Sequence, residues 1–321
     1  MIVTVEWLRE HIEDENVRII DCRFDLANPN WGREKYEEGH IPHALYFDLN
    51  LDLSSPIAEH GGRHPLPNIE EFADKLSEAG IDEHTTVIAY DSQAGANAAR
   101  LWWLCNYVGH EKVYILDGGF PAWKENGLPT TAEIPVAIRK TFKANIQDYM
   151  LVTMETVREN IRAGADVTLI DSREPKRYAG VEELVDHKAG HIPTAVNHFW
   201  KDGMLQSGQF KNGAGQQERF QNLSKDKETI VYCGSGVTAC PNIVALKLAG
   251  FQNVKLYAAS RQSRGVDPPV QIRRVEGAQR KWCGKTSVFL LRETGMSGHF
   301  VGHIKGAKYR FDLQFLTWDF S

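Results

Sequence analysis

The sequence lacks any apolar run long enough to cross a membrane, for which about 20 consecutive apolar residues are needed. None of this length occurs in its 321 residues. The first residues, Met1 to Glu10, also lack the basic start and apolar core of a secretory signal peptide. These two absences predict a soluble protein with no membrane partner, and the expected location is the cytoplasm.

Cysteine is scarce, and its spacing suggests no pairing. The chain has five cysteines, at positions 22, 105, 233, 240 and 283. An odd number at these distances matches neither a disulfide framework nor the close pairs of a zinc site. Any role for cysteine is therefore expected to belong to a single thiol.

An excess of positive charge is also absent. The formal net charge is -5 and the isoelectric point is near 6.2, which excludes nucleic acid and anionic membranes as the main partners. A small anionic substrate would have to be held by local cationic groups. The hydrophobic content of 42% and charged content of 25% are those of a globular protein, and 321 residues leave room for two domains.

An internal repeat divides the chain into two halves. Four segments recur in the same order, about 150 residues apart, which is close to one domain length. The pairs are Val17–Arg23 with Val167–Arg173, Gly39–Ala44 with Gly190–Ala195, Thr86–Asp91 with Thr229–Cys233, and Gly109–Leu116 with Gly250–Tyr257. Two homologous domains are therefore expected.

Each half alternates short apolar runs with segments of helical periodicity, which is typical of βα units on a mainly parallel sheet. Strands are expected near Ile19–Asp21, Ala44–Phe47, Val87–Tyr90, Val113–Leu116, Thr168–Ile170, Val196–Asn197, Thr229–Tyr232 and Val254–Tyr257. Helices are expected near Val5–His11, Ile69–Ala79, Ala96–Val108, Thr153–Arg162, Gln216–Gln221 and Pro241–Ala249.

The domain boundary falls where this periodicity is lost. Residues 127–135 carry two prolines and no helical or strand pattern. We expect a non-catalytic domain over 1–130, a surface linker over 131–150 and a catalytic domain over 151–260. The remaining residues, 261–321, form an atypical segment whose structure the sequence does not establish.

The strongest chemical signal is Cys233, which stands between a strand pattern and a helix pattern. Gly234 and Gly236 follow it and can adopt positive φ, so that backbone amides from about Gly234 to Ala239 can point at the cysteine sulfur. Such a nest, with the positive end of the helix dipole, favours a thiolate and would shield a persulfide. Cys233 is therefore predicted to be a nucleophile.

Two other interpretations of this loop have less support from its residues. A lone cysteine at a strand end is commonly a small buried apolar residue, but the flanking Gly-Ser-Gly and the immediate helix start favour a nucleophile. A phosphate-binding loop would carry a Gly-Lys-Ser/Thr ending or a GxGxxG spacing, and neither is present.

The stretch Cys233-Gly-Ser-Gly-Val-Thr-Ala239 resembles the active-site loop of the rhodanese family. Among tandem-domain members it is similar to the 3-mercaptopyruvate sulfurtransferase version, because the thiosulfate version usually has Arg and Lys where this chain has Gly234 and Ser235. The resemblance covers residue 1 to about Ser260. It implies an α/β fold with two homologous rhodanese-like domains, each a mainly parallel five-stranded sheet with helices on both faces.

The resemblance also implies an activity. A small anionic sulfur donor, 3-mercaptopyruvate or thiosulfate, would give its sulfane sulfur to Cys233, and the resulting persulfide would pass it to cyanide or a thiol in a ping-pong reaction. The thiol acceptor would be a small thiol or a thioredoxin-like protein. No metal and no organic cofactor are implied.

Several site residues follow from the same resemblance. Arg177 matches the arginine with which family members hold the donor, whereas the second donor arginine of the mercaptopyruvate enzymes would fall at Asp186, close to Lys188. In the loop, Ser235 can donate a hydrogen bond to the donor or persulfide. The substrate-binding positions expected in this loop are Gly234, Gly236, Val237 and Thr238.

A long loop of the first half, Ser54–Pro67, resembles the family segment that reaches across to the active-site loop. It places His60 near the histidine that is proposed to relay a proton with the loop serine, and it makes Arg63 a positive wall. The partner aspartate of that relay would align near Asn50, with Asp48 and Asp52 as substitutes on which no prediction is made.

Asp21, Asp171, His40 and His191 occur in motifs that both halves share, although only the second half has a cysteine in its loop. Folding explains such shared residues better than catalysis does. The first half has Asp91 in place of Cys233, and a carboxylate does not attack sulfane sulfur usefully. This half is therefore expected to provide one wall of a cleft between the domains.

Cys240 lies inside the helix pattern that follows Cys233. A role as resolving thiol is one interpretation, and a packed core cysteine is the favoured one.

The chain departs from the family after Ser260. The expected Gly-Ser-Trp-x-x-Trp motif is replaced by a basic, proline-containing stretch, and Ser287–Glu293 and Gly302–Ala307 faintly repeat the earlier motifs. A truncated third repeat, chance, a shifted reading frame and a rearranged gene remain alternatives. This departure also leaves open a non-enzymatic or impaired persulfide-binding module, while a phosphatase is disfavoured because no arginine follows the loop before Arg261.

Overall fold

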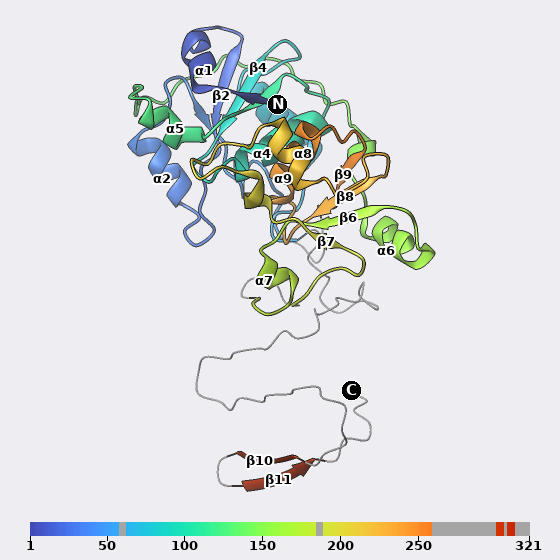
Figure 1. The fold of residues 1–321 in the computed structure, drawn as a ribbon. Helices are drawn as coiled ribbons and strands as arrows, with labels where there is room; N and C mark the ends of the chain where they lie inside the picture. Colours follow the sequence, from blue (N-terminus) through green and yellow to red (C-terminus); the bar gives the residue numbers. More distant parts are fainter. Residues whose placement is uncertain (58–61, 184–188, 259–299, 305–306, 312–321) are drawn as a thin grey trace. The chain divides into compact units, whose positions relative to one another are not determined.

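The structure is a computed structural model, and it describes residues 1–57, 62–183, 189–258, 300–304 and 307–311 (Figure 1). The chain divides into two compact units, Met1–Val275 and Glu276–Ser321. Both repeated halves lie within the first unit. None of the helices in the described ranges is long and apolar enough to span a bilayer.

The first half is built on a parallel five-stranded sheet with the strand order β1-β5-β4-β2-β3. Its strands are β1 (Ile2–Val3), β2 (Val17–Asp21), β3 (Leu45–Tyr46), β4 (Thr86–Tyr90) and β5 (Val113–Leu116). Its helices are α1 (Val5–His11), α2 (Trp31–Glu38), α3 (Ile69–Glu78), α4 (Ala96–Tyr107) and α5 (Gly119–Glu125).

Successive residues of the central strand β4 face opposite sides of this sheet. Val87 and Ala89 join the apolar cluster that contains residues of α3 and α4, whereas Ile88 and Tyr90 join the cluster that contains residues of α1 and α5. Helices therefore cover both faces, which explains why the central strand is an almost continuous apolar run.

The second half repeats this order in a parallel sheet, β7-β6-β8-β9. Its strands are β6 (Thr168–Asp171), β7 (Val196–Asn197), β8 (Thr229–Tyr232) and β9 (Val254–Leu256). Its helical segments are η1 (Asp148–Met150), α6 (Met154–Ala163), α7 (Pro175–Tyr178), η2 (Trp200–Gly203), α8 (Gly213–Arg219) and α9 (Ala239–Leu248).

The sheet of the second half differs from the expected five strands. Four strands are formed, and the place of the fifth is taken by a single parallel bridge between Leu151 and Leu256. The backbone amide of Val152 donates to the Leu256 carbonyl at 2.9 Å. The pairing stops there because Thr153 already caps α6, with its side chain accepting the Thr156 amide at 3.2 Å.

The elements expected from the sequence are present, with shifts at their ends. Helix α9 begins at Ala239 instead of Pro241, so that Pro241 lies in the first turn, where its missing N–H costs no helical bond. Helix α8 begins at Gly213 instead of Gln216. Four short elements, β1, α2, α5 and α7, were not expected from the sequence.

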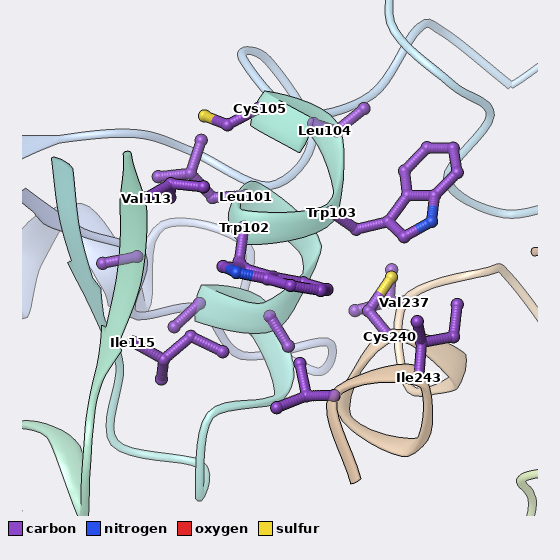
Figure 2. Packing of buried hydrophobic residues seen from close by; sticks show 14 of the residues in the cluster. Leu101, Trp102, Trp103, Leu104, Cys105, Val113, Ile115, Val237, Cys240 and Ile243 are labelled. Carbon is purple, nitrogen blue, oxygen red and sulfur yellow. The ribbon is translucent and has the colours of Figure 1, made fainter. Parts of the chain in front are cut away.

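The two halves share one apolar core around α4 and α9 (Figure 2). Leu101 and Trp102 of α4 belong to one buried cluster. The same cluster contains Val237, which precedes α9, and Cys240 and Ile243 in the first turns of α9. Helix α4 is buried along nearly its whole length. The loop that carries Cys233 is thus packed against α4 of the first half.

The linker lies along the first half. His40 and Thr131 exchange backbone hydrogen bonds of 2.8 and 2.9 Å, and Phe142 is buried. Between them Val136 and Ile138 are exposed. This stretch therefore has both exposed and buried apolar residues, and the linker bounds 131–150 stay a prediction.

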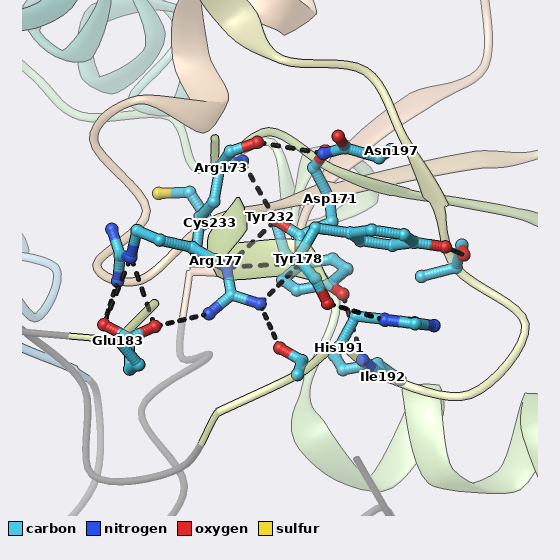
Figure 3. A network of polar contacts seen from close by, with 12 residues as sticks. Asp171, Arg173, Arg177, Tyr178, Glu183, His191, Ile192, Asn197, Tyr232 and Cys233 are labelled. Carbon is cyan, nitrogen blue, oxygen red and sulfur yellow. Dashed lines mark hydrogen bonds and ion pairs between the residues drawn. The ribbon is translucent and has the colours of Figure 1, made fainter. Parts of the chain in front are cut away.

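The shared Asp and His motifs form the same contacts in both halves. Arg23 makes hydrogen bonds to both carboxylate oxygens of Asp21, and Arg173 does so with Asp171 (Figure 3). All four side chains are buried. In both halves a histidine stacks on a tyrosine, His40 on Tyr36 and His191 on Tyr178, with ring centroids 3.9 and 3.8 Å apart. These contacts explain the conserved spacing of the two copies by folding alone.

In the second unit the described residues form an antiparallel hairpin of β10 (Phe300–Ile304) and β11 (Ala307–Phe311). The motif-like residues Gly302–Ile304 are therefore in a strand. The other motif-like segment, Ser287–Glu293, lies outside the described residues.

We expect Asp171→Asn to lower the free energy of unfolding by about 3 kcal/mol, because it leaves the buried guanidinium of Arg173 without its main counter-charge. Urea unfolding measures the effect. Asp166→Asn is the matched control, since Asp166 is exposed and its ion pair with Lys227 should contribute at most about 1 kcal/mol. Equal losses in the two variants would contradict the structural role of Asp171.

Candidate active site

A cavity of about 750 Å³ opens between the two halves, within the first unit. Residues from both halves line it. The first half contributes Arg63 and His64, and the second contributes Arg177, Lys201 and the loop that follows Cys233. This is the cleft between domains that the repeat predicts.

The charged side chains that line this cavity, among the described residues, are all positive. Arg63, Arg177 and Lys201 line it, and none of the described lining residues is an aspartate or glutamate. Such a lining raises the local concentration of small anions, so the cavity compensates for the net negative charge of the chain. Lys201 is a cation that the sequence analysis did not identify, because η2 is irregular and carries no motif.

The Cys233 loop turns its backbone toward the sulfur. The amides of Ser235 and Gly236 donate to Cys233 Sγ at 3.4 and 3.1 Å. Gly236 has φ 75°, and a Cβ there would lie 3.0 Å from the Ala258 carbonyl oxygen, so glycine is required at this position. The expected nest is confirmed for these two amides.

The sulfur itself is enclosed. Cys233 is 1% exposed, while its neighbours Gly234, Ser235, Val237 and Thr238 line the cavity. Gly236 is absent from that lining, and its amide instead contacts the sulfur. Thr238 occupies the N-cap position of α9, but its side chain makes no capping hydrogen bond. Cys233 itself is therefore not part of the lining; it belongs to the buried apolar cluster, next to loop residues that line the cavity.

The corresponding loop of the first half shows what this backbone binds. The carboxylate of Asp91 accepts the amides of Gln93, Gly95, Asn97 and Ala98 at 2.7 to 2.9 Å. The two loops therefore have the same arrangement, a turn between strand and helix whose backbone amides can bind an anion. In the first half that anion is part of the chain, and in the second half a sulfur takes its place.

Arg177 lies on α7 and lines the cavity, as the resemblance implies. Its guanidinium is also paired with Glu183, with Nε at 3.1 Å and Nη2 at 3.0 Å from that carboxylate (Figure 3). Glu183 additionally holds Arg173 at 3.3 Å. The position of Arg177 is therefore set by an ion pair that the sequence analysis missed, because Glu183 belongs to no recognised motif.

The predicted His60 lies outside the described residues, as do Asp186 and Lys188. His64, four positions after His60 in the same loop, lines the cavity and is 5% exposed. Its Nδ1 has no hydrogen-bond partner among the groups that the structure describes. Burial, with the charges of Arg100 and Arg63, lowers the pKa of His64 to about 4, so this imidazole is neutral at pH 7.

The aspartates near Asn50 have other partners. Asp48 accepts the amides of Asn50 and Leu51, and Asp52 pairs with Lys75 at 2.9 Å. None of the three candidates Asn50, Asp48 and Asp52 lines the cavity. Among the described residues, these candidates for the aspartate of a Ser–His–Asp relay therefore do not reach the cavity.

Comparison with known proteins agrees with this geometry. A rhodanese-like domain model matches residues 4–126 and 153–262. The chain is 37% identical over 272 residues to a probable 3-mercaptopyruvate sulfurtransferase of Pseudomonas aeruginosa, covering 83% of this chain and 95% of that protein. It is 32% identical over 269 residues to a thiosulfate sulfurtransferase of Gallus gallus, covering 81% and 91% of the two chains.

A solved structure shows the same similarity. SseA from Escherichia coli, which is described among 3-mercaptopyruvate sulfotransferases with the rhodanese fold, aligns with a TM-score of 0.70 at 32% identity. The alignment covers 80% of this chain and 97% of that chain.

We expect His64 to make the protein less stable in acid. Its pKa falls from about 6.5 in the unfolded chain to about 4 in the folded one, so that between these values the unfolded state binds more protons. The stabilisation is complete above about pH 6.5 and is lost as the pH falls toward 4, a change on the order of 3 kcal/mol. His198, whose pKa is also lowered to about 4 by burial, adds a similar dependence.

Urea unfolding between pH 4 and 7 tests this expectation. A His64→Asn variant should lose the His64 contribution, keep those of His198 and His110, and show a flatter pH dependence than the wild type. Parallel curves for the two proteins would contradict the burial of a neutral His64.

Proposed function

Because this chain belongs to the rhodanese-like domain family, we propose that it is a sulfurtransferase that carries sulfane sulfur on Cys233. The donor is 3-mercaptopyruvate or thiosulfate, and the acceptor is cyanide or a thiol, either a small thiol or one on a thioredoxin-like protein. The catalytic part is the second half, residues 151–260. The first half, residues 1–130, is the non-catalytic domain in the sense that it carries no nucleophile; it closes the cavity and contributes His64 to it.

The observation that carries this proposal is the sulfur of Cys233 facing two backbone amides at the edge of a cavity with cationic walls. The amides stabilise negative charge on the sulfur, and the cations attract a negative donor. The carboxylate in the matching loop of the first half supports this interpretation, since it is an anion held by the same backbone turn.

The reaction has two steps. The Cys233 thiolate attacks the sulfur of 3-mercaptopyruvate, the carbon–sulfur bond breaks, and its electron pair leaves on the enolate of pyruvate. The enolate carbon then takes the proton of the persulfide, which remains as an anion. In the second step an acceptor thiolate attacks the outer sulfur and releases the Cys233 thiolate, as in other covalent catalysis.

Ser235 and His64 are the groups proposed to handle the proton, because both line the cavity beside the loop. A neutral His64 can accept or donate a hydrogen bond without adding charge. This assignment gives His64 the role that the sequence analysis proposed for His60.

Between the donors, Gly234 and Ser235 after the nucleophile favour 3-mercaptopyruvate, as does the similarity to the Pseudomonas aeruginosa protein. Arg177 would bind its carboxylate, sharing its charge with Glu183.

A second candidate function is supported by the enclosure of the sulfur, which is 1% exposed at Cys233. A chain that accepts sulfur slowly and holds it for a protein partner would be a persulfide relay. Mass spectrometry after donor treatment separates the two: a gain of one sulfur on Cys233 without turnover supports the relay.

We expect Cys233→Ser to abolish sulfur transfer from 3-mercaptopyruvate and from thiosulfate, because none of the cavity-lining residues that the structure describes is a cysteine. Pyruvate and sulfite release measure the two reactions. Cys105→Ala is the matched control, a buried cysteine of α4 outside the cavity, and it should retain activity. Residual transfer by Cys233→Ser would contradict the persulfide mechanism.

We expect Arg177→Leu to raise KM for 3-mercaptopyruvate about tenfold, the loss of one charge-assisted hydrogen bond to the donor. Steady-state kinetics at constant ionic strength measure it. Lys176→Leu is the control, because Lys176 is exposed, pairs with Glu182 and does not line the cavity. Equal changes in KM for both variants would mean that the loss of any nearby positive charge causes the effect. Such a result would exclude Arg177 from donor binding.

A further inference from the structure

Arg100 is a buried cation of the first half that reaches the active-site loop of the second. It lies on α4 and is 0% exposed. Its guanidinium donates to the carbonyls of Leu53, His64, Pro65 and Gly236 at 3.2 to 3.4 Å. All four acceptors are neutral, and their hydrogen bonds are long.

No carboxylate pairs with Arg100 in the part of the chain that the structure describes. The contrast with the other deeply buried arginines is clear, since Arg23 and Arg173 each hold an aspartate at 2.6 to 2.7 Å. A buried guanidinium without a counter-charge is costly, and its cost falls when an anion lies nearby. Burial lowers the pKa of Arg100, while the sulfurs of Cys240 and Cys233 act in the opposite direction.

One residue connects Arg100 to the nucleophile. Gly236 accepts from Arg100 Nη1 through its carbonyl at 3.4 Å and donates through its amide to Cys233 Sγ at 3.1 Å. The thiol of Cys240 donates to the same carbonyl at 3.2 Å. Burial raises the pKa of Cys240 to about 12, so Cys240 stays neutral at pH 7 and cannot supply the missing charge.

The two halves differ at this position. Arg100 follows Asp91 at the same spacing as Asn242 follows Cys233. Asn242 bonds within its own half, to Ser172 and the His198 carbonyl. The first half thus has an anion in its own loop and directs its cation across the core, toward the loop that contains the sulfur.

We propose that Arg100 is a positioning residue of the sulfur-transfer site, whose buried guanidinium acts through Gly236 as the fixed counter-charge of the Cys233 thiolate and persulfide. This inference rests on the proposed function and deepens it. Each intermediate keeps one negative charge on sulfur, so a charge fixed in the core of the first half serves both steps without moving. The non-catalytic half then contributes to the chemistry as well as to the cavity.

The test measures the rate at which iodoacetamide alkylates Cys233 in the full chain between pH 5 and 10, with the modified peptide identified by mass spectrometry. Arg100→Met should move the midpoint of the pH–rate profile about one unit higher and slow alkylation about tenfold at pH values well below the wild-type midpoint. Arg100→Lys, which keeps the charge, should restore most of the shift. Arg9→Met, at an exposed arginine of the first half, should leave the profile unchanged.

An unchanged midpoint of the pH–rate profile in Arg100→Met would overturn the inference, whatever the thermal stability of the variant. Arg100 would then only stabilise the packing of the two halves. Alkylation requires neither donor nor turnover, so a shifted midpoint in a protein that transfers no sulfur would refute the proposed function and keep the inference.

A second measurement needs no variant of Arg100. If the thiolate compensates the buried guanidinium, the thermal midpoint of the wild type should rise relative to that of Cys233→Ser as the pH increases from 6 to 9. A constant difference between the two proteins over this range would also overturn the inference.

Discussion

The structure depends on one electrostatic constraint, that negative charge at the turn between a strand and a helix must be met by inward-facing backbone amides. In the first half the carboxylate of Asp91 accepts hydrogen bonds from four amides, so a side chain of the same half supplies the negative charge. In the second half the amides of Ser235 and Gly236 face a sulfur. The same turn holds a carboxylate in the first half and, in the proposed function, the reacting sulfur in the second.

The shared core explains how two halves of similar fold can have different roles at one cavity. Helices α4 and α9 pack in one apolar cluster, so the active-site loop rests on the first half (Figure 2). The cavity takes Arg63 and His64 from one half and Arg177 and Lys201 from the other. The two halves carry equivalent turns that both line the cavity, and under the proposed function the first half places charge around the nucleophile of the second.

Much of this could be predicted from the sequence. The repeat and the alternating pattern gave the strands and longer helices, because buried parallel strands are apolar along their length. Cys233 stood out through Gly234 and Gly236, of which Gly236 has the positive φ that requires glycine. What could not be predicted depends on distant contacts: the ion pair of Arg177 with Glu183, the burial of His64, the contacts of Arg100 across the core, and the reduction of a fifth strand to the bridge at Leu151.

The most direct test of the central claim is the intact mass of the protein, followed by peptide mapping, after a short exposure to 3-mercaptopyruvate and removal of excess donor. The account predicts the gain of one sulfur atom on the peptide that contains Cys233, and its loss when cyanide or a thiol is added. No gain from either 3-mercaptopyruvate or thiosulfate, or a gain confined to another cysteine, would contradict it.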